Sequence, residues 1–153
     1  MHNKEYGEKN ADLAGLVKEQ NPDFIAVCGD MVNRGDPDTT KMKDVLKKLA
    51  DIAPTYCCLG NHERDNAAEF GTDFKSEIDS TGAVLLDDEY IKFTKNGKSV
   101  LIGGMSDYPY YEFYTPEDDV PSRTLWEEFA EKAKNNFTIL LHHQPEYIAE
   151  DAK

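Results

Sequence analysis

The stretch Pro54-Thr-Tyr-Cys-Cys-Leu-Gly-Asn-His-Glu63 joins a short apolar run to an abrupt polar end. The run stops at Gly60, and an amide, an imidazole and a carboxylate follow it. Apolar runs of this length between Pro and Gly are typical of buried strands. We therefore expect a strand over residues 55–59 that delivers Asn61 and His62 at its carboxyl end.

Two further apolar runs have the same design. Residues 24–28 lead into Gly29-Asp30, and residues 137–141 lead into His142-His143. In open α/β sheets, ligands bind at the edge formed by the carboxyl ends of the strands. We therefore expect the three strand ends to meet at one edge and to form a site there.

The rest of the chain alternates between helical and extended patterns. Helical spacing or capping residues predict helices over residues 10–20 (N-cap Asn10), 38–52 (N-cap Asp38 or Thr39), 65–80 (interrupted at Gly71) and 122–135 (starting at Ser122 or Thr124). Short extended runs cover residues 83–86, 90–94 and 99–103, and Asn96-Gly97 predicts a hairpin between the last two. This order predicts a single α/β domain over residues 1–153 with layered helices and mixed sheets.

The length of 153 residues and the hydrophobic content of 39% are those of one folded domain with a real core. The net charge of −13 repels phosphate backbones and anionic membranes, so nonspecific nucleic-acid binding is not expected. A small phosphorylated substrate remains compatible with this charge, because bound cations invert the local charge of a carboxylate-rich site.

The cysteine pattern indicates a reducing compartment. The three cysteines, Cys28, Cys57 and Cys58, lie inside apolar runs and have no CxxC spacing, so we expect buried, reduced thiols. The N-terminus is polar without a visible signal peptide, and no apolar run approaches the roughly 20 residues of a membrane span. We expect a cytoplasmic protein, with membrane association through a segment upstream of residue 1 left open.

The residue types at the three strand ends fit a metal site. The Asp30 carboxylate can bridge two cations, Asn61 offers a carbonyl oxygen and His143 an imidazole nitrogen, a mixed set that suits Mn, Fe, Zn or Co. Two such ions about 4 Å apart can clamp a phosphoryl group and activate a water. His62, on the opposite pleat from Asn61, would stay unligated and protonate a leaving alkoxide or orient the phosphate. Glu63 and Asn33 are candidates to orient His62.

Each motif alone has an ordinary structural interpretation. A Gly-Asp pair after a strand is usually a turn or a helix cap, an Asn-His pair is more often a turn, and the histidine pair has even odds of being structural. The coincidence of three strands ending in compatible ligands, in a chain with four histidines, favours the site. We interpret the aromatic cluster from Tyr108 to Tyr114 as core or site wall, and Trp126 as core.

The same motifs resemble those of the calcineurin-like metallophosphoesterases. Gly29-Asp30-Met-Val-Asn33-Arg34-Gly35 is similar to the family's GDxxDRG motif, Gly60-Asn61-His62-Glu63 to its GNH[ED] motif, and Ile139-Leu-Leu-His-His143-Gln-Pro145 to its later LLxHxP segment. The resemblance covers nearly the whole chain. It implies a four-layer α/β/β/α sandwich and a dinuclear metal centre that hydrolyses phosphomonoesters or phosphodiesters.

The resemblance also assigns roles by position. Asp30 would be the bridging ligand, Asn61 a ligand of the second metal, and His143, rather than His142, the ligand histidine. His62 would be the catalytic histidine, supported by Arg34 and Asn33. The family usually has Asp where this chain has Asn33, and an amide accepts a hydrogen bond without supplying charge.

Two family motifs depart from the pattern. His2 would be the histidine of an N-terminal Asp-x-His motif whose aspartate and strand lie upstream of residue 1, and the C-terminal Gly-His-x-His does not follow His143. We therefore expect a partial domain that lacks its first strand, its C-terminal part and up to three ligands, with weak or no activity. The alternative is a non-catalytic remnant of the fold that acts as a scaffold or interaction module. The sequence specifies neither the substrate beyond a small phosphoester nor an oligomeric state.

Overall fold

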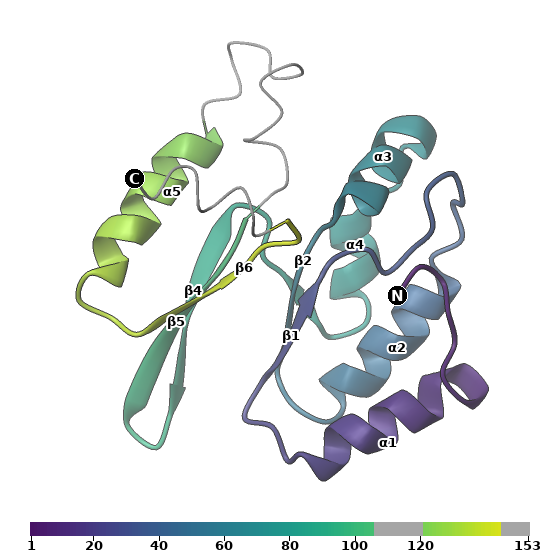
Figure 1. Ribbon diagram of the computed structural model, residues 1–153, viewed down its shortest axis with the longest axis horizontal. Coiled ribbons are helices and arrows are strands. Elements are labelled where there is room, and N and C mark those ends of the chain that lie inside the picture. The colour runs from purple at the N-terminus through teal and green to yellow at the C-terminus, as the bar shows by residue number, and fades with distance from the viewer. Residues whose placement is uncertain (106–120, 145–153) are drawn as a thin grey trace.

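The computed structural model describes residues 1–105 and 121–144, with side chains from residue 127 onward in the second range. The helices are η1 (Glu8–Asn10), α1 (Ala11–Glu19), α2 (Thr40–Ala50), α3 (Asn61–Phe70), α4 (Phe74–Asp79) and α5 (Pro121–Ala133). The strands are β1 (Ile25–Cys28), β2 (Thr55–Cys58), β3 (Val84–Leu85), β4 (Glu89–Lys95), β5 (Lys98–Gly104) and β6 (Thr138–Leu141). Figure 1 shows two sheets packed together, with α5 outside one and α1 and α2 outside the other. This arrangement confirms the predicted layered α/β fold.

The first sheet is parallel and the second is mixed. β2 lies between β1 and β3 in parallel pairing, with Val27 opposite Cys57. β4 and β5 form an antiparallel pair, and β6 joins β5 in parallel. The parallel pairing of β1 with β2 places the two motif-bearing strand ends at the same edge, and β6 contacts β1 from the other sheet.

The predicted hairpin is confirmed. Asn96 and Gly97 have φ values of 52° and 74°, both in the left-handed region. A two-residue turn with positive φ at both positions matches the twist of the flanking strands, and Asn-Gly is the pair that adopts it most readily. The hairpin strands extend beyond the predicted runs, from residue 89 to residue 104.

Two apolar clusters join the layers. Between the parallel sheet and its helices, α2 buries the residues that its helical spacing predicts: Met42, Val45, Leu46 and Leu49. Between the sheets, the Phe24 ring lies 5.3 Å from the Phe93 ring and 6.1 Å from the Tyr56 ring, centroid to centroid. On the far side of the mixed sheet, the buried Phe129 of α5 lies with its ring 6.0 Å from that of Tyr90.

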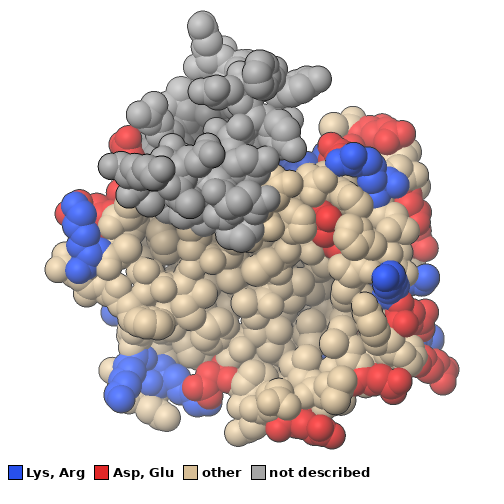
Figure 2. Space-filling view, viewed as in Figure 1, with Lys and Arg blue, Asp and Glu red and all other residues tan. Residues whose placement is uncertain are grey.

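Charged residues lie mainly around the margin of the face shown in Figure 2, with both signs interspersed. The centre of that face, over β1 and β6 in Figure 1, is uncharged. Within residues 1–105 and 121–144, none of the helices combines the length and apolar character that crossing a bilayer requires.

The predicted cap of the first helix is wrong. Asn10 occupies the N-cap position of α1, but its φ of 61° is left-handed and its side chain forms no cap hydrogen bond. Its side-chain oxygen instead accepts the Tyr6 N–H at 3.0 Å, so Asn10 stabilises the chain that precedes the helix. The helix itself ends at Glu19, close to the predicted boundary.

The helix expected from residue 65 begins earlier, at Asn61. The Glu63 side chain accepts the N–H of Gly60 at 2.9 Å. This is one of the two hydrogen bonds of a capping box, and it requires no side chain on the N-cap residue. Asn61 and His62 therefore share the first turn of α3, and the expectation that they occupy opposite pleats of a strand is wrong. Gly71, with φ 69°, ends α3 in the left-handed conformation that separates it from α4.

The expectation of three buried thiols is confirmed for two of them and wrong for the third. Cys57 and Cys58 are buried, whereas Cys28 is exposed, and none of the three forms a disulfide. Cys28 is exposed because β1 lies at the edge of its sheet, and burial alternates along the strand. The aromatic cluster from Tyr108 to Tyr114 and the side chain of Trp126 lie outside the described residues, so their interpretation stays a prediction.

Candidate metal centre

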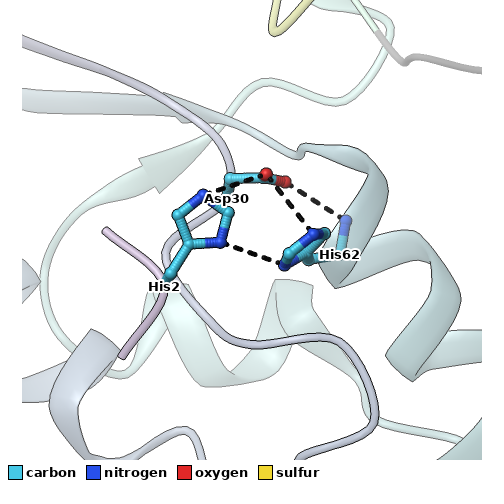
Figure 3. Close-up of side chains that lie close together, drawn as sticks. All are labelled: His2, Asp30 and His62. Atoms are coloured by element: carbon cyan, nitrogen blue, oxygen red, sulfur yellow. Dashed lines mark hydrogen bonds and ion pairs between the residues drawn. The ribbon is translucent and has the colours of Figure 1, made fainter. Parts of the chain in front are cut away.

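Three segments distant in sequence bring polar side chains to one carboxylate, that of Asp30. Asp30 follows β1, His62 lies in the first turn of α3, and His2 comes from the N-terminal segment (Figure 3). The Nε2 atoms of His2, His62 and His143 lie 3.6, 3.8 and 3.3 Å from the Oδ2 atom of Asp30. The structure therefore brings together the strand-end residues singled out in the sequence, with Asn61 beside the other carboxylate oxygen.

The backbone at the two motif glycines explains how Asp30 reaches this position. Asp30 has a φ of 50°, in the left-handed region that Asp and Asn tolerate better than most residues. A Cβ atom on Gly60 would lie well inside van der Waals distance of the Asp30 carboxylate, and one on Gly29 would overlap the Gly60 backbone. Both glycines are therefore required for the close approach of the ends of β1 and β2.

Glu63 holds the Asp30 loop through the backbone. Its fully buried carboxylate accepts the N–H groups of Asp30 at 2.7 Å, Met31 at 2.6 Å and Val32 at 3.0 Å, in addition to that of Gly60. Charge-assisted hydrogen bonds of this kind are roughly twice as strong as neutral ones. We had expected Glu63 to orient His62, whereas these contacts place it beneath the Asp30 loop.

His2 reaches the site because the first residues run beside the same loop. The His2 N–H donates to the Asp30 carbonyl at 3.0 Å, and the Asn3 N–H donates to the Met31 carbonyl at 3.0 Å. The Lys41 ammonium of α2 donates to the Asn3 carbonyl at 3.1 Å. These bonds fix the backbone that carries the His2 imidazole, whose Nδ1 atom lies 3.2 Å from that of His62.

The surroundings of His143 indicate its tautomer. Its Nδ1 atom lies 2.9 Å from the carbonyl oxygen of Cys28, and because a carbonyl only accepts, Nδ1 must donate. In the neutral ring, Nε2 then presents a lone pair to the Asp30 carboxylate, acceptor against acceptor. Histidines that bind metals characteristically donate their other ring N–H to such a partner. A cation between His143 and Asp30 would suit these two facing acceptors.

His62 is oriented by backbone groups. Its Nδ1 atom lies 3.2 Å from the Val32 carbonyl and 3.2 Å from the Arg34 N–H. Asn33 lies between them in sequence with an exposed side chain, and its carbonyl accepts a hydrogen bond from Asn66 at 2.8 Å. The structure therefore places Val32 and Arg34, rather than the Asn33 amide, against the His62 ring.

Asn66 fixes the rest of the loop and was missed by the sequence analysis. This fully buried amide accepts the Gly35 N–H at 2.8 Å and donates to the carbonyls of Asn33 and Asp36, each at 2.8 Å. An asparagine within a helix carries no sequence signal for such a role. Asn66 stands three residues after Glu63, so the two side chains lie on one face of a helix. This inference required knowing that the helix begins before Glu63.

The Asn61 amide lies between Asp30 and Arg34. With its nitrogen toward Asp30, it donates to Oδ1 at 3.2 Å, and its oxygen then accepts from the Arg34 guanidinium at 2.9 Å. This orientation satisfies both neighbours, because a carboxylate only accepts and a guanidinium only donates. The Arg34 Nε atom lies 2.6 Å from the Oδ2 atom of Asp65, a contact that the sequence did not indicate.

An exposed thiol lies beneath the site. A hydrogen bond from the Cys58 thiol is the main cause that lowers the pKa of Cys28 to about 7, and the nearby His143 lowers it further, against the effect of burial. Burial raises the pKa of the neighbouring Cys57 to about 12. The surroundings of Cys28 in β1 therefore stabilise a thiolate far better than those of Cys57 in β2.

The donor set fits a divalent transition-metal ion. One potential ligand atom from each of His2, Asp30 and His62 lies within 4.8 Å of the others. Imidazole nitrogens with carboxylate and amide oxygens suit Mn, Fe, Zn or Co.

A sequence profile of the calcineurin-like phosphoesterases matches residues 2–152. The chain belongs to this family.

Two curated proteins are similar to the chain. Phosphodiesterase YaeI of Escherichia coli (strain K12) is 34% identical over 95 residues, which are 61% of this chain and 35% of that protein. The uncharacterized metallophosphoesterase YkoQ of Bacillus subtilis (strain 168) is 23% identical over 150 residues, 97% of this chain and 52% of that protein. The matched part is thus about a third of one relative and about half of the other.

Proposed function

We propose that this chain carries a dinuclear metal centre that hydrolyses phosphoesters. The observation that carries the proposal is the convergence of three imidazole Nε2 atoms within 3.8 Å of one oxygen of Asp30. Bound divalent ions would neutralise charge on a phosphoryl group and activate a water for attack. Membership of a phosphoesterase family supports this chemistry over other uses of a mixed nitrogen and oxygen site.

Each residue has a role in this proposal that follows from its position. Asp30 would be the central ligand of the ions, because its carboxylate is the common neighbour of the other groups. His2, Asn61 and His143 would complete the ligand set. His62 is held through Nδ1 by backbone groups, so its Nε2 atom points into the site and can donate a proton to the leaving alkoxide.

The substrate that we propose is a small phosphodiester, with a phosphomonoester as the second possibility. One relative is named a phosphodiesterase, which favours the diester. The net charge of −13 disfavours nonspecific binding of nucleic acid, so a compact substrate fits better than a polymer. The ions would offset the repulsion between this charge and the phosphate.

Hydrolysis of bis-p-nitrophenyl phosphate with added Mn²⁺ tests the proposal, with p-nitrophenyl phosphate assayed in parallel. His62→Ala should lower turnover by about 10²- to 10⁴-fold, the range that a positioned proton donor contributes. Mn²⁺ affinity should stay within a few-fold of wild type, because His62 is not assigned as a ligand. The measurement combines initial rates with a Mn²⁺ titration of the same samples.

Glu69→Ala is the matched control, since Glu69 is exposed on the same helix, α3. It should leave both turnover and Mn²⁺ affinity unchanged. Wild-type turnover no higher than that of His62→Ala would overturn the catalytic proposal. If the chain also bound no more than one weak Mn²⁺ equivalent, the result would favour the alternative, a non-catalytic scaffold or interaction module.

A further inference from the structure

We propose that Arg34 is a positioning residue that competes with bound metal for the side-chain oxygen of Asn61. The inference rests on the proposed metal centre and specifies how one of its ligands becomes available. It follows from the donor and acceptor chemistry of three neighbouring groups: a carboxylate, an amide and a guanidinium.

The Arg34 guanidinium spans two partners. Its Nε atom lies 2.6 Å from Asp65 in α3, and its Nη2 atom lies 2.9 Å from the oxygen of the Asn61 amide in the orientation that satisfies both groups. The planar guanidinium presents both nitrogens in a fixed geometry, so the Asp65 contact aims the other nitrogen at Asn61. In that orientation, Arg34 holds the amide oxygen away from Asp30.

Ligation of an ion beside Asp30 requires the opposite orientation of the amide. Asn61 would have to turn its oxygen toward Asp30, and its NH₂ group would then face the guanidinium, donor against donor. The hydrogen bond to Arg34 and the bond to an ion are therefore mutually exclusive. Arg34 must withdraw when Asn61 becomes a ligand.

Withdrawal of Arg34 is feasible because its anchor is weak. The side chains of Arg34 and Asp65 are 59% and 47% exposed, and ion pairs this exposed contribute little to stability. The lost hydrogen bond between Arg34 and Asn61 is nevertheless a cost of metal binding. Removing the guanidinium should therefore tighten metal binding, an effect opposite to that of removing a residue that supports a ligand.

A double-mutant cycle tests the competition. Mn²⁺ dissociation constants are measured from the EPR signal of free Mn²⁺ for wild type, Arg34→Ala, Asn61→Ala and the double variant, with folding checked by circular dichroism. Arg34→Ala should tighten binding about threefold to tenfold, the factor expected from one net hydrogen bond. The same change in the Asn61→Ala background should alter affinity less than twofold, because no amide remains to be released.

Two further variants separate competition from charge. Arg34→Lys keeps the positive charge but cannot span both partners, so it should tighten binding as Arg34→Ala does. If the charge alone matters, Arg34→Lys will match wild type, which would overturn the inference. Lys75→Ala removes a similarly exposed cation from its pair with Asp79 in α4, at 3.1 Å, and should leave affinity unchanged.

Other outcomes are equally decisive. Weaker or unchanged Mn²⁺ binding by Arg34→Ala overturns the inference while leaving the metal centre intact. Equal tightening with and without the Asn61 amide also overturns it, since the guanidinium would then act through space. Absence of Mn²⁺ binding by wild type would instead overturn the metal centre itself, and this inference with it.

Discussion

Asp30→Asn should remove Mn²⁺ binding and phosphoesterase activity together, with a loss of roughly 100-fold or more in metal affinity, beyond the range seen for groups that only support a ligand. The Asp30 carboxylate is the common neighbour of three imidazoles and one amide. An amide in its place has one oxygen and no charge, so it is a much poorer ligand for two ions at once. Titration with Mn²⁺ and assay of bis-p-nitrophenyl phosphate measure the two losses.

Asparagine is the suitable replacement because the left-handed conformation of Asp30, with φ 50°, is one that Asn adopts readily. The fold should therefore survive, as circular dichroism can verify. Asp88→Asn is the matched control, since Asp88 also has a left-handed φ, of 54°, and is not part of the cluster. Mn²⁺ affinity of Asp30→Asn within tenfold of wild type would be incompatible with a bridging role.

Glu63→Gln should lower the free energy of unfolding by about 3 kcal/mol or more, because it breaks a buried set of charge-assisted hydrogen bonds. The Glu63 carboxylate is fully buried and accepts backbone N–H groups from both motif loops. Glutamine has the same size, but its NH₂ group would face N–H donors. Urea unfolding followed by circular dichroism measures the change.

The exposed Glu69 of α3 supplies the control. Glu69→Gln should change the free energy of unfolding by less than about 0.5 kcal/mol, as surface substitutions usually do. A loss below about 1 kcal/mol for Glu63→Gln would show that the two loops are held by other contacts. The loop that carries Asp30 should also become less ordered in Glu63→Gln. Because Asp30 is a proposed ligand, the variant should bind Mn²⁺ more weakly than wild type.

Local sequence patterns predicted the elements that carry the site. The apolar runs before Asp30, Asn61 and His143 form β1, β2 and β6. The ends of β1 and β2 meet as expected of parallel neighbours, whereas β6 brings His143 to the same place from the other sheet. The Asn96-Gly97 turn was equally predictable, because few residue pairs adopt positive φ at both positions. In each case the signal lies within a few residues of the feature that it predicts.

The remaining features depend on contacts between distant segments. The Asp65 contact with Arg34 and the hydrogen bonds of Asn66 become visible only when α3 lies against the loop after β1. The start of α3 was missed although Gly60 and Glu63 have the spacing of a capping box, because Gly60 lacks the usual N-cap side chain. Cys28 was expected to be buried because a sequence does not show which strand lies at a sheet edge.

Anomalous diffraction from crystals grown with Mn²⁺ tests the metal centre most directly, because it locates the ions without reference to activity. We expect two Mn²⁺ peaks about 3.5–4 Å apart, the spacing of two-metal sites, with the Asp30 carboxylate between them. Asn61, His2 and His143 should be among their ligands, and Asn61 should have turned its oxygen away from Arg34. Peaks remote from Asp30, or none at saturating Mn²⁺, would contradict the account.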